Sequence, residues 1–184
     1  MNRRARNNSR PAACRGFTLM EAALATVIIG VGVVASMELF AACTRQATAA
    51  NRMTIALMLA GNIQEITQAL AFNDPVSGTS VFGPEADETL ATYDDVDDFD
   101  GCTFNPPIDA ARQPLPQLAQ YSQVVSVMPV YPVKPGGNTS ETAPEIPKTA
   151  YTGACRVRVR VLFRARPSDA PVEVYRASWI CLDR

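Results

Sequence analysis

Few side chains in this sequence could carry out catalytic chemistry. The chain contains no His, so neither a serine nor a cysteine nucleophile can be paired with the commonest general base. The remaining candidate nucleophiles include five cysteines: Cys14, Cys43, Cys102, Cys155 and Cys181. Because none of them has a recognisable base beside it, we expect the protein not to be an enzyme.

The densest group of candidate metal ligands is acidic. Five carboxylates lie within seven residues: Asp94, Asp95, Asp97, Asp98 and Asp100. They repel one another unless they are solvated or neutralised by a cation. Their spacing differs from the alternating acids of an EF-hand because Val96 and Phe99 interrupt it. The run therefore has two open interpretations, a solvated acidic loop and a calcium site; no other cofactor is indicated.

The positions of the cysteines restrict their pairing. Cys14 lies in a basic N-terminal segment and Cys43 lies in an apolar run, which leaves three cysteines for the rest of the chain. Three thiols allow at most one disulfide within that part.

The N-terminal part of the sequence has the character of a membrane anchor. Residues 1–16 contain five Arg and no acid, and residues 17–43 form a nearly continuous apolar run. Sixteen uncharged residues separate Glu21 from Glu38, and as a helix they span roughly 24 Å. Because basic flanks stay in the cytoplasm, we expect a single-pass protein with its N-terminus inside and its C-terminal part outside.

Glu21 is unusual in this apolar run. A carboxylate in such a position costs on the order of 2.5–3.5 kcal/mol toward the bilayer centre. It closes the segment Arg15-Gly16-Phe17-Thr18-Leu19-Met20-Glu21. This segment resembles the type IV prepilin signal: a basic leader, Gly before the cut, Phe as the first mature residue, Glu at the fifth mature position, and a following apolar helix.

The resemblance implies processing and assembly. A prepilin peptidase would remove residues 1–16 by cutting between Gly16 and Phe17, and would methylate the new amine of Phe17. Glu21 would pair with the Phe17 amine of a neighbouring subunit in a low-dielectric setting, where an unpaired charge is costly. The alternative is that Glu21 lies at the headgroup level of an ordinary anchor. The implied partners are prepilin peptidase, other pilins or pseudopilins in a fibre, and an inner-membrane assembly platform.

The apolar run continues into an amphipathic segment over residues 44–72. No Pro occurs between Phe17 and Phe72, and apolar residues recur at helical spacing. These residues are Ile55, Leu59, Ile63, Ile66 and Leu70. We therefore expect one helix from Thr18 to about Ala71, ended by Asn73-Asp74-Pro75.

The composition and alternation of residues 73–184 predict a small periplasmic domain. Residues 73–120 are rich in Pro, Gly and acids and indicate an irregular connection, whereas 121–131 are rich in Val and indicate a strand. Residues from Cys155 onward alternate strongly, and after the turn at 166–169 a second strand covers 172–182.

A hairpin in which paired residue numbers sum to 336 gives this domain one wholly apolar face. It sets Val157 against Trp179 and Cys155 against Cys181. This register predicts a Cys155–Cys181 disulfide, with Cys102 as the competing partner. On the other face lie Arg156, Arg158, Arg160 and Arg164, for which we expect solvation or, as the alternative, a contact with acidic neighbours in another subunit.

The expected fold is α+β: a long N-terminal transmembrane helix whose outer half packs on an antiparallel sheet of about three strands, the pilin-like lollipop. The resemblance implies a minor pilin or pseudopilin of a type IV pilus or a type II secretion pseudopilus. The alternative is a single-pass, membrane-anchored periplasmic binding module. Without the leader the side chains sum to 12 basic and 18 acidic residues, or −6, so nucleic-acid binding is not expected.

Overall fold

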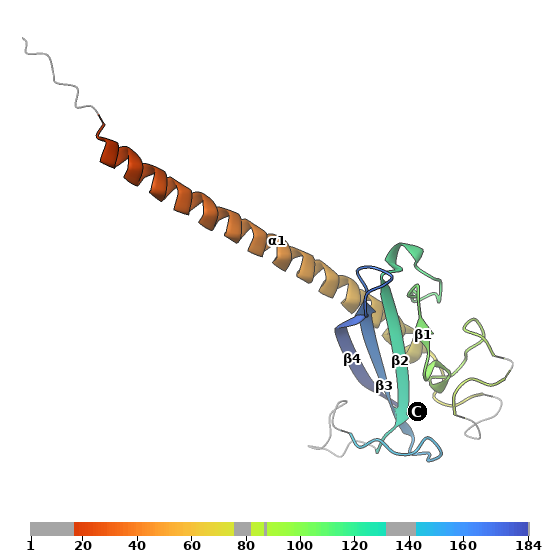
Figure 1. Cartoon of the computed structure of the whole chain (residues 1–184). Coiled ribbons are helices and arrows are strands. Elements are labelled where there is room, and N and C mark those ends of the chain that lie inside the picture. Colours follow the sequence, from red (N-terminus) through yellow and green to blue (C-terminus); the bar gives the residue numbers. More distant parts are fainter. Residues whose placement is uncertain (1–16, 76–81, 87, 132–142, 184) are drawn as a thin grey trace, which may run out of the picture. The chain divides into compact units, whose positions relative to one another are not determined.

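The computed structural model describes residues 17–75, 82–86, 88–131 and 143–183. The chain separates between Ala47 and Thr48 into two units, which are described one at a time. The elements in chain order are helix α1 (Leu19–Ala69), β1 (Thr103–Phe104), β2 (Tyr121–Pro129), β3 (Ala154–Phe163) and β4 (Val172–Leu182) (Figure 1). Single-turn 3₁₀ helices lie at Asp97–Phe99 and Pro116–Leu118.

Helix α1 is uninterrupted over 51 residues, and this confirms the expectation of one long apolar helix. It is long and apolar enough to cross a membrane. It ends at Ala69, six residues before Pro75, so the proline does not end it directly. Ala71 instead leaves the helix to pair with the acidic run, where its N–H donates to Asp94 O and its carbonyl accepts from the N–H of Val96.

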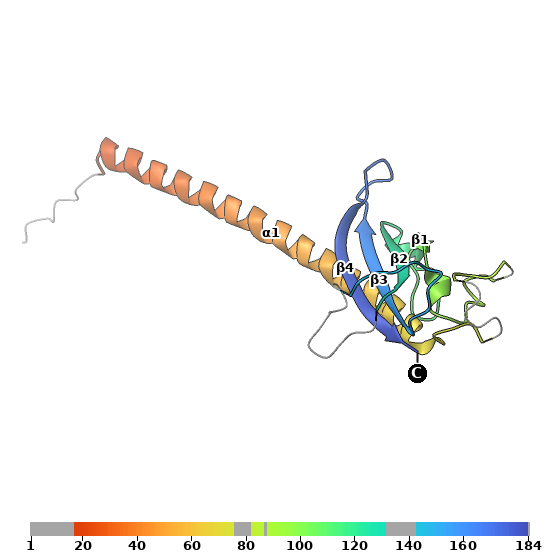
Figure 2. The ribbon, with the colours of Figure 1, turned by 90° about the horizontal axis from the view of Figure 1, so that it is seen from below.

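The second unit contains one antiparallel sheet with the strand order β1-β2-β3-β4 (Figure 2). The register of β3 and β4 is the predicted one, with Val157 opposite Trp179 and Cys155 opposite Cys181. It holds as far as Val161 and then shifts by one residue at Leu162. The sequence predicted β2, β3 and β4 closely, but the two-residue β1 was not expected.

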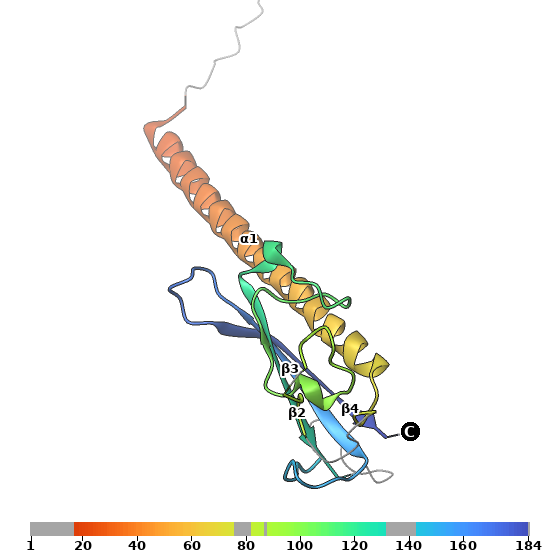
Figure 3. The same ribbon diagram turned by 90° about the vertical axis from the view of Figure 1, so that its right-hand side faces the viewer.

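The core of the second unit lies between the C-terminal part of α1 and one face of the sheet (Figure 3). Leu59 and Ile63 are fully buried there, as the helical spacing predicted. They meet the Val side chains of β2 and β3, which alternate inward along both strands. Burying a Leu or Ile side chain contributes roughly 1.5–3 kcal/mol, so this contact holds the end of the helix on the sheet.

Gln123 is a polar side chain inside this core. It is fully buried, and its Nε2 donates to Leu59 O at 2.9 Å and to Ile108 O at 3.1 Å. Its Oε1 accepts from the N–H of Ile108 at 2.8 Å. One amide therefore joins α1, β2 and the loop before β2, and sequence analysis did not identify it.

Candidate functional site

The first site is the start of α1, where Thr18 and Glu21 cap the helix reciprocally. The Glu21 carboxylate accepts from the Thr18 backbone N–H at 3.2 Å and from the Thr18 hydroxyl at 3.1 Å. The Thr18 hydroxyl in turn accepts from the Glu21 N–H at 3.2 Å. This is a capping box, which satisfies backbone donors that the first helical turn leaves unpaired.

The capping box gives Glu21 an intramolecular role that sequence analysis missed. The signal was present as Thr and Glu three residues apart before an apolar run. Phe17 precedes the cap and is 75% exposed. Gly16 and the leader lie outside the described residues, and pairing of Glu21 with another subunit's amine remains a prediction.

The first unit presents an apolar surface around the helix. Large apolar side chains between Leu19 and Phe40 are more than half exposed in the single chain. A shallow groove on this surface is lined by Gly32, Ser36 and apolar neighbours, and the Ser36 hydroxyl donates to Gly32 O at 2.7 Å. Small residues four apart let another helix approach closely in a membrane.

The acidic run is ordered by its own carboxylates. Asp98 Oδ2 accepts from the N–H groups of Asp94 and Asp95 at 3.0 and 3.2 Å. Asp95 Oδ1 accepts from the N–H groups of Asp97 and Asp98 at 3.0 and 3.1 Å. Asp95 and Asp98 are 4% and 1% exposed, so a solvated loop is the wrong description for these two residues.

The other acids of the run hold neighbouring segments. Asp97 Oδ2 accepts from the Gly83 N–H at 2.9 Å, and Asp100 Oδ1 accepts from the Val127 N–H at 2.9 Å. Asp100 also forms an ion pair with Lys148. The run thereby links the loop after α1 to strand β2.

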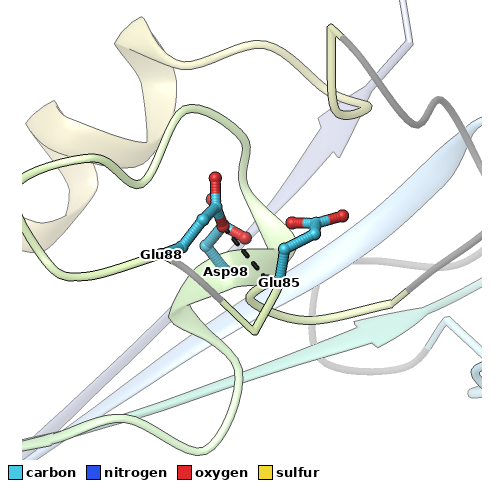
Figure 4. Close-up of side chains that lie close together, drawn as sticks. All are labelled: Glu85, Glu88 and Asp98. Carbon is cyan, nitrogen blue, oxygen red and sulfur yellow. Dashed lines mark hydrogen bonds between the residues drawn. The ribbon is translucent and has the colours of Figure 1, made fainter.

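The five predicted calcium ligands do not converge on one point in the structure. Within the described ranges, one group of three acidic side chains has ligand oxygens within 4.8 Å of one another, and it consists of Glu85, Glu88 and Asp98 (Figure 4). Asp98 is the only predicted ligand in this group. Glu85 and Glu88 precede the acidic run in the sequence. Their spacing matches no known metal-binding motif, so sequence analysis had no reason to select them.

Burial makes ionisation of these acids unfavourable. Loss of hydration, with a smaller contribution from the neighbouring Asp97, raises the pKa of Asp95 to about 8. Loss of hydration also raises the pKa of Asp98. The pKa of Glu88 is raised by loss of hydration and then by contact with Asp98. At neutral pH the loop therefore holds the Asp95 side chain mainly in its uncharged form, and it disfavours the ionised forms of Asp98 and Glu88.

The cysteines of β3 and β4 lie opposite each other as predicted, and both are free thiols in this structure. A hydrogen bond donated by Cys155 to Cys181, together with burial, raises the pKa of Cys155. The same bond lowers the pKa of Cys181. Cys102 instead lies 3.9 Å from the Tyr93 hydroxyl and 3.5 Å from Asp98 O. The disulfide itself remains a prediction.

The arginine row of β3 is less solvated than expected. Arg156 is 3% exposed, and its guanidinium donates to Glu145 at 2.6 Å and to Ala143 O. Arg158 shares Glu145, and Arg160 binds Glu173 at 3.2 Å. The expectation of solvation was wrong for Arg156, because residues of the loop before β3 cover it.

Comparison of the chain with family models, curated proteins and solved structures finds no match in any of the three.

Proposed function

We propose that this protein is a minor pilin or pseudopilin, a structural subunit of a type IV pilus or type II secretion pseudopilus. Prepilin peptidase removes residues 1–16, and the exposed apolar half of α1 packs against the same helices of other subunits. The observation that carries the proposal is the start of α1, where a carboxylate follows the Gly16-Phe17 junction and precedes a helix surface with apolar side chains exposed.

The apolar surface supports this proposal because it needs a partner on every side. Lipid covers this surface before assembly, and the helices of neighbouring subunits cover it in the fibre. Close helix packing is favoured by small residues such as Gly32 and Ser36 on the groove side. This part of α1 therefore suits a helix that contacts lipid in the membrane and other helices in the fibre.

The rival function, an anchored binding module, would use the acidic run or the arginine row as its receptor site. Asp95, Asp98 and Asp100 accept intramolecular hydrogen bonds, and Arg156 and Arg160 bind acids of the same chain. Groups engaged in this way are poorly placed to bind a receptor. This supports the fibre subunit over the binding module.

The capping box allows a sharp test of Glu21. Glu21→Gln keeps an oxygen that can cap the helix but removes the charge that would pair with the Phe17 amine of another subunit. Thr18→Val does the reverse, since it loses the hydroxyl and keeps the charge. Glu38→Gln is the matched control, with the same change of charge further along α1.

We expect Glu21→Gln to be cut after Gly16 and inserted normally but to enter fibres at least about tenfold less than wild type, because each 1.4 kcal/mol of lost pairing is tenfold. Thr18→Val and Glu38→Gln should enter fibres nearly as well as wild type. The measurements are the membrane fraction, the N-terminal mass and the amount in sheared or cross-linked filaments. Wild-type incorporation of Glu21→Gln together with failure of Thr18→Val would show that Glu21 acts only as a cap.

A further inference from the structure

We propose that Glu85, Glu88 and Asp98 bind a calcium ion. The site lies wholly in the second unit and does not depend on the proposed function. It replaces the five-Asp ligand set that the sequence predicted, because only Asp98 belongs to both.

The geometry of the three carboxylates suits a calcium ion. One oxygen from each side chain lies within 4.8 Å of the other two (Figure 4). Calcium binds oxygens at about 2.3–2.6 Å, so two ligands on opposite sides of the ion are roughly 5 Å apart. Three oxygens with this spacing can share one ion, and backbone carbonyls or water can complete its six to eight ligands.

The buried carboxylate of Asp98 favours binding of a cation. Its side chain is 1% exposed, and Oδ2 already accepts two backbone N–H bonds. Oδ1 is buried, and among the described residues it has no hydrogen-bond partner apart from the carboxyl group of Glu88, which contacts the Asp98 side chain. A buried carboxylate oxygen that faces only another carboxyl group is costly, because the two groups repel each other when both are ionised. A cation between them would supply the missing partner.

Nearby basic side chains are engaged elsewhere. Lys148 pairs with Asp100, and the Arg112 guanidinium donates to the carbonyls of Leu90 and Tyr93. In the part of the chain that the structure describes, no Lys or Arg forms an ion pair with Glu88 or Asp98. A bound cation would compensate the charge of Glu88 and Asp98 when both are ionised.

The donor set selects the kind of metal. All three ligands are carboxylates, and the chain has no His to offer to zinc or copper. Carboxylate oxygens suit calcium and magnesium. Magnesium requires near-ideal octahedral ligands at about 2.0–2.1 Å, whereas calcium tolerates irregular shells, so an irregular loop site favours calcium.

The test measures thermal unfolding and calcium binding of the full chain in detergent after treatment with EDTA. Sites of extracellular modules bind calcium at about 10⁻⁴–10⁻³ M, so the titration runs through this range. We expect one ion per chain by calorimetry. Calcium at about ten times its Kd should raise the Tm of the second unit by roughly 3 °C or more.

Glu88→Gln is the test variant because Glu88 is partly exposed and Gln keeps the size of the side chain. It should bind calcium at least about tenfold more weakly, since a hard cation depends on ligand charge. Glu65→Gln, on the exposed side of α1, is the matched control and should respond as wild type does. No rise in wild-type Tm at millimolar calcium would overturn the proposal, as would an unchanged response of Glu88→Gln. An equal response to magnesium would overturn the assignment to calcium.

Discussion

Glu21, Asp95 and Asp98 share a way of bonding, in which a carboxylate accepts the N–H of a residue two to four positions away. Local bonds of this kind compete with repulsion between neighbouring acids. Sequence analysis considered only the repulsion, and so expected water or a cation around all five aspartates. The reciprocal bonds of Asp95 and Asp98 depend on the loop conformation, which the sequence pattern could not supply.

The two thiols of the β3–β4 hairpin should differ in reactivity. Cys155 is 5% exposed, whereas Cys181 is half-buried and lines a groove beside the end of α1. We expect the reduced protein to be alkylated at Cys181 at least about tenfold faster than at Cys155, because the accessible thiol with the lower pKa reacts first. Timed alkylation followed by peptide mass spectrometry measures both rates.

The same peptide mapping tests the disulfide. We expect protein isolated without reductant to yield a peptide that joins Cys155 to Cys181, since the register places them opposite each other. A peptide linked through Cys102 would contradict this pairing.

At the scale of elements, alternation along β3 and β4 was enough to predict their register. Only one pairing buries Val157 and Val159 together with Trp179, and a slip of one residue would bury the arginines. Burial of Arg156 could not be predicted in this way, because its partners Glu145 and Ala143 O come from a loop of irregular sequence. The short β1 also lacked a periodic signal.

The Gln123 side chain should contribute strongly to the free energy of unfolding, because it makes three buried hydrogen bonds. Gln123→Leu would leave the N–H and carbonyl of Ile108 buried with fewer partners, and each unpaired group costs about 1–3 kcal/mol. We expect the free energy of unfolding of the second unit to fall by about 2–3 kcal/mol. Gln120→Leu, at an exposed neighbouring position, should change it by less than about 0.5 kcal/mol. Urea unfolding of both variants distinguishes the two cases.

At the scale of the whole molecule, charge is divided unevenly along the chain. The leader holds five of the 17 basic residues and none of the 18 acidic ones. Removing it would change the net charge from −1 to −6 and would leave an anchor without basic residues before Glu21. The long apolar helix could thus be predicted from composition and spacing, whereas the processing signal stays a prediction. The choice between a pilus and a pseudopilus could not be predicted, because neither the helix nor the sheet encodes the partner.

Processing is the property of the whole chain that the proposed function predicts most directly. Gly16→Val should accumulate full-length precursor in the membrane, because a larger side chain beside the scissile bond would crowd the peptidase. Wild-type protein should begin at Phe17, with one added methyl group in its intact mass. Ala13→Val is the matched leader variant, because it also adds bulk but lies away from the scissile bond, and it should be cut normally. Normal cutting of Gly16→Val would count against the prepilin assignment.

Strand β4 lies at an edge of the sheet, and within the described part of the chain it pairs with β3 alone. An open edge of eleven residues could take up a strand of another molecule and begin aggregation. Glu173 and Arg176 place charge along it, and the shift in register after Val161 disturbs its regularity. In the proposed fibre subunit, these features would discourage pairing between the sheets of neighbouring molecules. Contacts between the proposed subunits would then be confined to helices, and a fibre held together in that way could be disassembled and its subunits used again.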